Sequence, residues 1–226
     1  MITFTKVSKQ YVDQTPALHG VSLKIPTGDF VSIVGQSGAG KSTLLKLLSA
    51  EEKPTQGNIV IDGWDITKIK NWQVPYLRRQ IGVVFQDFKL LPKRTAFENV
   101  AFAMEVGGAL PKDIRKAVPQ ILKLVNLLDK SDTYPNEMSG GERQRISIAR
   151  ALAYKPQILL ADEPTGNLDA LNSWDIVQLL MKINKLGTTV LLATHNDDIV
   201  NALKKRVVTL NQGKVVSDQE AGTYKL

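Results

Sequence analysis

The chain of 226 residues is predicted to be an α/β protein with a mixed, largely parallel sheet, antiparallel strands near the N-terminus and an inserted helical subdomain. Three observations predict this fold. Apolar strand patterns alternate with helical patterns, which implies a parallel sheet covered on both faces. Residues 96–154 are mostly helical in pattern and interrupt that alternation. A glycine-rich stretch, 35–42, lies between an apolar run and a helical pattern, as phosphate-binding loops do.

The strands are predicted from short apolar or alternating segments. Alternation at 2–7 and 21–25 predicts edge or antiparallel strands. The turn at 26–29 leads into the apolar run 30–34, which predicts a buried strand. Further strands are predicted at 58–62, 81–85, 157–161, 188–193 and 207–210, and helices at 43–51, 170–186 and 197–204.

The helical middle of the chain is predicted to be an insert. One helical face there is apolar at Ile121, Leu122, Leu124, Val125 and Leu128. Pro119 is expected to start or to kink this helix, because proline has no amide N–H. We therefore expect one domain over 1–226, with a core formed by 1–87 and 157–226 and a helical subdomain over about 88–156.

Composition restricts the class of protein. A hydrophobic share of 43% and a charged share of 23% are ordinary for soluble globular chains. No apolar run is long enough to span a bilayer and no export signal is visible, so the cytosol is the default compartment. The absence of cysteine excludes disulfides and thiolate metal sites. The formal charge of +7 suits a phosphate-bearing partner but does not identify one.

The glycine-rich stretch has the residue types that a polyphosphate requires. Glycines let backbone N–H groups curl around the anion, and the following helix adds positive potential. Lys41 is expected to reach the β- and γ-phosphates, and Ser42 to offer its hydroxyl to Mg²⁺. The predicted nucleotide contacts in this segment are Gly35, Gln36, Ser37, Gly38, Ala39, Gly40, Lys41, Ser42 and Thr43.

Two carboxylates follow the apolar run 158–161, at the strand end where open α/β sheets bind ligands. Asp162 suits a metal-holding role. Glu163 is expected to point the other way by strand alternation and to polarise an attacking water. The alternative is that both are merely exposed acids at a strand end.

A second phosphate-binding helix start is predicted at residues 139–142. Ser139 and Glu142 have the spacing of a capping box, which is a purely structural explanation. Capping alone does not need Gly140 and Gly141, which would expose backbone donors to an anion. If this segment lies far from 35–42, each nucleotide must lie between two subunits, and an ATP-dependent head-to-tail homodimer follows.

With these motifs in this order, the chain resembles the nucleotide-binding subunits of ATP-binding-cassette (ABC) systems over its whole length. The resemblance implies a P-loop ABC ATPase that binds ATP and Mg²⁺. It also implies that Tyr11 stacks on adenine and that Gln86 contacts metal and water at a hinge between subdomains. Residues 139–142 correspond to the family's signature, although Met138 and Glu142 replace the usual Leu and Gln.

Two further positions carry over from the same resemblance. Asp169 closes a loop that crosses the dimer, and His195 is the switch histidine near the γ-phosphate. The resemblance therefore implies Lys41, Gln86, Glu163 and His195 as the catalytic set, and Ser42, Gln86 and Asp162 as metal contacts. The alternatives are purely structural: Tyr11 packs on the sheet edge, His195 has a structural role and Gln86 caps a strand end.

Within the ABC family, residues 68–70, 74–82, 85–95 and 98–106 are similar to those of the bacterial cell-division ATPases. That similarity implies an integral membrane partner resembling FtsX, a place at the cytoplasmic face of the membrane and signalling to cell-wall hydrolases, with no nucleic acid. The alternatives are lipoprotein-release or macrolide-export ATPases, a soluble DNA-processing ATPase and a small-molecule kinase. The apolar residues after Gln86 are expected either to line a groove for a partner helix or to form the insert's core.

Overall fold

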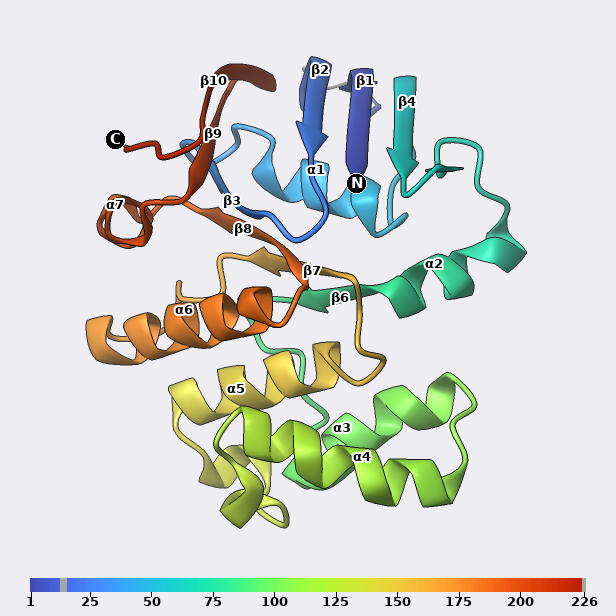
Figure 1. Cartoon of the computed structure of the whole chain (residues 1–226), viewed down its shortest axis with the longest axis vertical. Helices are drawn as coiled ribbons and strands as arrows, with labels where there is room; N and C mark the ends of the chain where they lie inside the picture. The colour runs from blue at the N-terminus through green and yellow to red at the C-terminus, as the bar shows by residue number, and fades with distance from the viewer. Residues whose placement is uncertain (13–15, 225–226) are drawn as a thin grey trace.

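The computed structural model describes residues 1–12 and 16–224. Two sheets and seven α-helices are stacked in layers in this part of the chain (Figure 1). The antiparallel sheet has the order β2-β1-β4-β5, with bounds Leu18–Ile25, Ile2–Lys9, Gln56–Ile61 and Trp64–Asp65. The second sheet has the order β10-β9-β3-β8-β7-β6, with bounds Lys214–Gln219, Arg206–Asn211, Phe30–Val34, Thr189–Thr194, Ile158–Asp162 and Ile81–Val84.

In the second sheet, all strands except the edge strand β10 run parallel. Parallel strands are fully buried between covering layers, and β3 and β8 accordingly contain only buried residues. The helices are α1 (Lys41–Leu48), α2 (Val74–Gln80), α3 (Ala96–Val106), α4 (Pro111–Leu124), α5 (Gly140–Ala151), α6 (Ala170–Lys185) and α7 (Asp197–Leu203). None of the described helices has the length and apolar run that a bilayer crossing requires.

Two hydrophobic cores lie on opposite faces of the parallel sheet. One core lies between the antiparallel sheet, α1 and the near face of β3, β7 and β8. The other lies between the far face and the helices α3 to α6, which form the lower part of the molecule in Figure 1. Because α1 is held between two sheets, its first turn is fixed against the end of β3.

The helices α3, α4 and α5 occupy the stretch predicted to be helical. Asn99 of α3 is fully buried and forms hydrogen bonds with the backbone of residues 91–95. Its Nδ2 donates to the carbonyl oxygens of Leu91, Arg94 and Thr95 at 3.1, 2.9 and 3.0 Å. Its Oδ1 accepts the Leu91 amide at 2.8 Å, so one side chain satisfies four backbone contacts.

The apolar residues after Gln86 are divided between the core of the helical region and its surface. Leu90, Phe97 and Met104 pack in the core of the helical region. Phe102 of α3 is 36% exposed. The region therefore buries most of these side chains and leaves some apolar surface outside.

The predicted α/β class, the antiparallel N-terminal strands and the strand 30–34 are confirmed. Four elements were not predicted: β5, the 3-10 helix Asn71–Gln73, α2 and β10. The expectation for Pro119 was wrong about the helix start, because α4 begins at Pro111 and continues through Pro119. The buried residues Ile114, Val118 and Leu122 hold one face of α4 in the core, and this packing outweighs the lost hydrogen bond.

Candidate active site

The loop between β3 and α1 is shaped by glycines that no other residue could replace without strain. Gly35 has φ 152°, and a Cβ there would lie 2.3 Å from the Leu210 carbonyl oxygen. Gly40 has φ 105°, and a Cβ would lie 2.5 Å from the Ala17 carbonyl oxygen. Gly40 is also the N-cap of α1 and supplies no side-chain hydrogen bond. The first amides of α1 are therefore left for an anion.

Lys41 is the first residue of α1 and is 7% exposed. Its ammonium donates to the carbonyl oxygens of Gly35 at 2.7 Å and Gln36 at 3.2 Å. It also lies 3.5 Å from Glu163 Oε1. A buried ammonium is thus held inside the loop's curve, at the point where phosphate oxygens would gather.

Ser42 and Asp162 meet across the gap between α1 and the end of β7. Ser42 Oγ donates to Asp162 Oδ1 at 3.0 Å. Burial raises the pKa of the Asp162 carboxyl above its ordinary value, and the hydrogen bond from Ser42 opposes that rise. Both side chains offer oxygen ligands, which is the ligand type that Mg²⁺ prefers.

Glu163 and His195 form a pair beside Lys41. β7 ends at Asp162, and Glu163 follows it with φ 46°, so the expected strand alternation does not apply to Glu163. The Glu163 amide donates to the Ala193 carbonyl at 2.9 Å, which ties it to β8. His195 Nδ1 lies 2.9 Å from Glu163 Oε1, and the His195 side chain is 59% exposed. A carboxylate and an imidazole at this distance can hold and orient a water molecule.

The loop before α1 and the side chains of Lys41, Ser42, Glu163 and His195 line one cavity of about 1250 Å³. Eleven of the predicted site residues line it: Tyr11, Gln36, Ser37, Gly38, Gly40, Lys41, Ser42, Thr43, Gln86, Glu163 and His195. Gly35 and Ala39 are buried beneath it, and Asp162 lines an adjoining cavity of about 580 Å³ together with Ser42 and Gln86. Residues 139–142 and Asp169 do not line either cavity.

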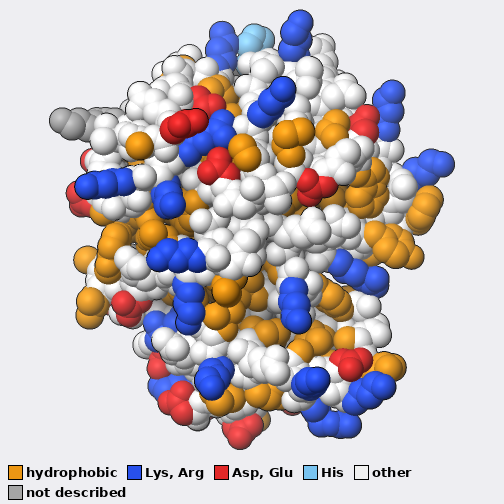
Figure 2. All heavy atoms as spheres, in the orientation of Figure 1, with side chains coloured by type: hydrophobic (Ala, Val, Ile, Leu, Met, Phe, Trp, Pro, Cys, Tyr) orange, Lys and Arg blue, Asp and Glu red, His pale blue; other side chains and the backbone are white. Residues whose placement is uncertain are grey.

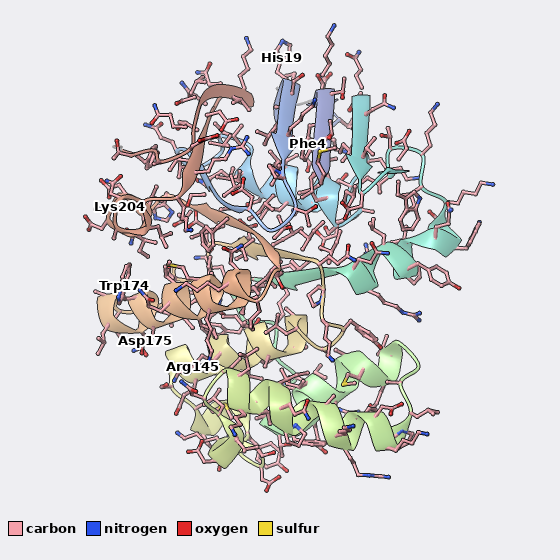
Figure 3. The ribbon with its side chains drawn as sticks, viewed as in Figure 1. Phe4, His19, Arg145, Trp174, Asp175 and Lys204 are labelled. Carbon is pink, nitrogen blue, oxygen red and sulfur yellow. The ribbon has the colours of Figure 1, made fainter. Side chains whose placement is uncertain are left out.

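Sequence reasoning missed five residues of the larger cavity: Pro16, Ala17, His19, Gln212 and Lys214. His19 lies near the start of β2, as Figure 3 shows. The Gly213 amide donates to Ala39 O at 3.1 Å, and the Gly213 carbonyl accepts the His19 amide at 2.8 Å. The turn between β9 and β10 therefore closes one side of the cavity, and only the pairing of β9 with β3 could have revealed it.

Tyr11 lies in the described part of the loop after β1. Its ring is half-buried, lines the cavity and lies 4.9 Å from Lys9 Nζ. A ring in this position is open to a planar partner on the cavity side.

Gln86 connects this cavity with the helical region. Its carbonyl accepts the Asn167 side-chain amide at 3.1 Å. After Gln86, the carbonyls of Phe88 and Lys89 accept the Arg150 guanidinium at 2.9 and 2.5 Å. The C-terminal part of α5 therefore holds the loop after Gln86 through hydrogen bonds.

The N-terminus of α5 carries the predicted second cradle. Ser139 is the N-cap, and the capping box is present: Ser139 N donates to Glu142 Oε2 at 2.8 Å, and Glu142 N donates to Ser139 Oγ at 3.3 Å. Glu142 also forms an ion pair with Lys130. A Cβ at Gly141 would lie 2.4 Å from Asn172 Oδ1, so a larger residue there would displace the Asn172 side chain.

Asp169 begins the helix that packs on this cradle. It is the N-cap of α6, and its Oδ1 accepts the Asn172 amide at 2.8 Å. Hydrogen bonds from Asn172 lower the pKa of the fully exposed Asp169 carboxyl. Asp169 thus has a local capping role in the single chain, alongside the interface role that the resemblance implies.

The glycine loop before α1, the buried lysine and the acidic end of β7 define a P-loop nucleotide-binding protein. Residues 18–166 match the ABC transporter family. The chain belongs to that family.

Curated relatives and solved structures agree with this assignment. The chain is 52% identical to the cell division ATP-binding protein FtsE of Bacillus subtilis, over 99% of this chain and 98% of that protein. It is 48% identical to FtsE of Mycobacterium tuberculosis, over 99% and 98%. A dimeric, post-hydrolysis structure of the ATP-binding cassette MJ0796 bound to ADP and Pi has 36% identity and a TM-score of 0.87, over 99% of this chain and 100% of that one. CbiO1 of Clostridium perfringens, part of the transporter complex CbiONQ, has 33% identity and a TM-score of 0.90, over 97% and 88%.

Proposed function

We propose that this chain is the ATP-hydrolysing subunit of a membrane ABC complex in bacterial cell division. The observation that carries the proposal is the convergence of Lys41, Glu163 and His195 on one cavity beside the loop before α1. The near-full-length identity to FtsE proteins supports the cell-division role.

The residues around the cavity are assigned separate tasks. Loop amides and Lys41 bind the β- and γ-phosphates of ATP. Ser42, Asp162 and Gln86 would hold Mg²⁺, which neutralises phosphate charge when it is bound. Glu163 orients and polarises the attacking water, and His195 contacts the γ-phosphate side while it fixes the Glu163 carboxylate.

We infer that two copies close head to tail around two ATP molecules. The second cradle, residues 139–142, does not line the cavity of its own chain. Gly140 and Gly141 stand at the start of the 12-residue helix α5, where backbone N–H groups can meet an anion. A second copy supplies that anion if its nucleotide faces this cradle. Tyr11 stacks on the adenine and the Asp169 loop crosses the interface.

We propose that closure of the dimer acts on an integral membrane partner resembling FtsX. A cleft of about 380 Å³ lies between α2 and β6 on one side and α3 and α5 on the other. Its lining includes Phe102, Val106 and Tyr154 together with the charged Arg78 and Arg79. An apolar floor with a basic rim suits a partner helix, and the subunit would act at the cytoplasmic face of the membrane as a peripheral protein. Signalling would pass through the partner to cell-wall hydrolases.

Substitution of the proposed base tests the ATPase mechanism. We expect Glu163→Gln to lower turnover by about 10² to 10⁴-fold, the usual effect of losing a general base, and to accumulate an ATP-bound dimer. ATPase rates and the mass of the protein in ATP and Mg²⁺ measure both effects. Glu220→Gln, at an exposed carboxylate, is the matched control and should leave both unchanged. Normal turnover of the Glu163 variant would remove Glu163 from the mechanism.

Co-purification tests the membrane role. The protein is recovered from detergent-solubilised membranes and the integral protein bound to it is identified. An FtsX-like protein is the expected result. A lipoprotein-release or macrolide-export permease in its place would contradict the cell-division assignment while leaving the ATPase mechanism intact.

A further inference from the structure

One surface segment exposes large aromatic side chains next to basic ones. It runs from the end of β5 through the 3-10 helix Asn71–Gln73 into α2. Trp72 is 66% exposed and Tyr76 is 56% exposed. Together with Lys68, Lys70 and Arg79, which are also exposed, they form what we call the basic–aromatic face.

The aromatic residues of this face are not needed to anchor the segment. Ile66, Ile69 and Leu77 are 3%, 2% and 0% exposed and belong to the core beside the antiparallel sheet. Lys68 and Lys70 flank Ile69, so the chain buries the isoleucine and turns both lysines outward. The segment is therefore fixed from within, and Trp72 and Tyr76 remain available to an external partner.

Charge along this segment has one sign. Between residues 66 and 86 the chain has four basic residues and no Asp or Glu. Arg78 is engaged within the protein, because its guanidinium donates hydrogen bonds to the Ser49 and Ala50 carbonyls. Asp65, just before the segment, carries one negative charge, because hydrogen bonds from Thr67 and Asn58 and attraction to Lys68 lower its pKa. The three exposed cations Lys68, Lys70 and Arg79 outnumber this carboxylate, so the face has a net positive charge that complements an anionic surface.

The basic–aromatic face brings cationic and aromatic side chains into direct contact. The Arg79 guanidinium lies 5.5 Å from the centre of the Tyr76 ring, so a cation and an aromatic face share one helix side. Figure 2 shows basic and hydrophobic side chains next to each other at the edge of the molecule where α2 lies. Arg79 also lines the cleft between α2 and α3, so the face is continuous with the surface assigned to the membrane partner.

We propose that the basic–aromatic face binds directly to a membrane surface rich in anionic lipid headgroups. Tryptophan and tyrosine favour the headgroup level, where the ring is partly buried and its polar atom stays hydrated. Lysines near the surface are attracted by anionic headgroups. This lipid contact goes beyond the proposed function and stands without the protein partner.

Vesicle binding with the full chain tests the proposal. The probe is a set of unilamellar vesicles that are either pure phosphatidylcholine or rich in phosphatidylglycerol. We expect binding to the anionic vesicles only, weakened by salt that screens the lysines. Lys68→Gln/Lys70→Gln should weaken binding about 25-fold, since each basic residue near the surface contributes about fivefold.

A matched variant separates a local face from net charge. Lys112→Gln/Lys116→Gln removes the same charge from exposed positions on α4 and should leave vesicle binding within about twofold of the wild type. With Trp64→Phe and Trp174→Phe, Trp72 is the sole tryptophan, and its fluorescence should shift to the blue on anionic vesicles.

Three outcomes would overturn the proposal: equal losses in the two lysine pairs, equal binding to neutral vesicles, or an unshifted Trp72 spectrum. Because the vesicles contain no protein, failure here would leave partner docking and ATP hydrolysis untouched. Unchanged thermal unfolding of both lysine variants shows that the fold is intact.

Discussion

The carboxylate at the start of α5 should make a stability contribution that depends on pH. Glu142 accepts the Ser139 amide at 2.8 Å and is paired with Lys130. The hydrogen bond from Lys130, together with that from the Ser139 backbone, lowers the pKa of Glu142 to about 2 from an ordinary value of about 4.5. The folded protein therefore favours the charged carboxylate.

Two substitutions separate the charge from the cap. Glu142→Gln keeps an acceptor for the Ser139 amide and loses the charge, whereas Glu142→Ala loses both. Without solvent screening, the shift in the pKa of Glu142 would correspond to roughly 3 kcal/mol of folding free energy. The Lys130 side chain is 38% exposed, so solvent screens the pair, and we expect about 1 kcal/mol for Glu142→Gln. Loss of the cap as well should raise the cost to about 2 kcal/mol for Glu142→Ala.

The pH dependence has a definite sign. A carboxyl with a lowered pKa stabilises the fold fully above its unfolded value, about 4.5, and loses that contribution as the pH falls toward about 2. Urea unfolding of wild type and Glu142→Gln, from neutral pH down to about pH 3, should show a stability difference that shrinks with acid. Lys130→Met should behave like Glu142→Gln and should add little to it. A difference that stays constant over this range would refute the reasoning.

Two other substitutions test the packing that supports the site. Asn99→Ala leaves the part-buried Leu91 amide and Arg94 carbonyl without the side-chain partner that they have in the wild type and should cost about 2 to 4 kcal/mol in urea unfolding, while the exposed Asn136→Ala should stay within about 0.5 kcal/mol. A small effect at Asn99 would mean that water replaces its contacts. Gly40→Ala places a Cβ 2.5 Å from Ala17 O and should weaken ATP binding at least tenfold in equilibrium titration. Gly28→Ala has a similar positive φ but open space around its Cβ, so equal losses of ATP affinity in both variants would contradict the steric argument.

The sequence predicted elements whose signals are local. The strand 30–34 and the loop that follows it were found because an apolar run, glycines and a helix stand next to one another in the chain. The capping box at Ser139 was found for the same reason. The short helix α2 was missed because its seven residues carry too little periodicity.

Contacts between distant strands could not be predicted in the same way. Glu163 reaches His195 because β7 and β8 are parallel neighbours, and the strand order is a property of the whole fold. Gln212 and Lys214 reach the cavity because β9 pairs with β3. Pro119 was misjudged because its local cost is outweighed by buried residues on the same helix.

The helix α5 has a mechanical consequence. It contains 12 residues, so it is a rod about 18 Å long with Ser139 at one tip and Arg150 near the other. Arg150 donates to the carbonyls of Phe88 and Lys89 just after Gln86, and α5 contains no proline that would kink it. A displacement of one end of α5 therefore displaces the other end, so this helix mechanically couples the backbone beyond Gln86 to residues 139–142 of the same chain.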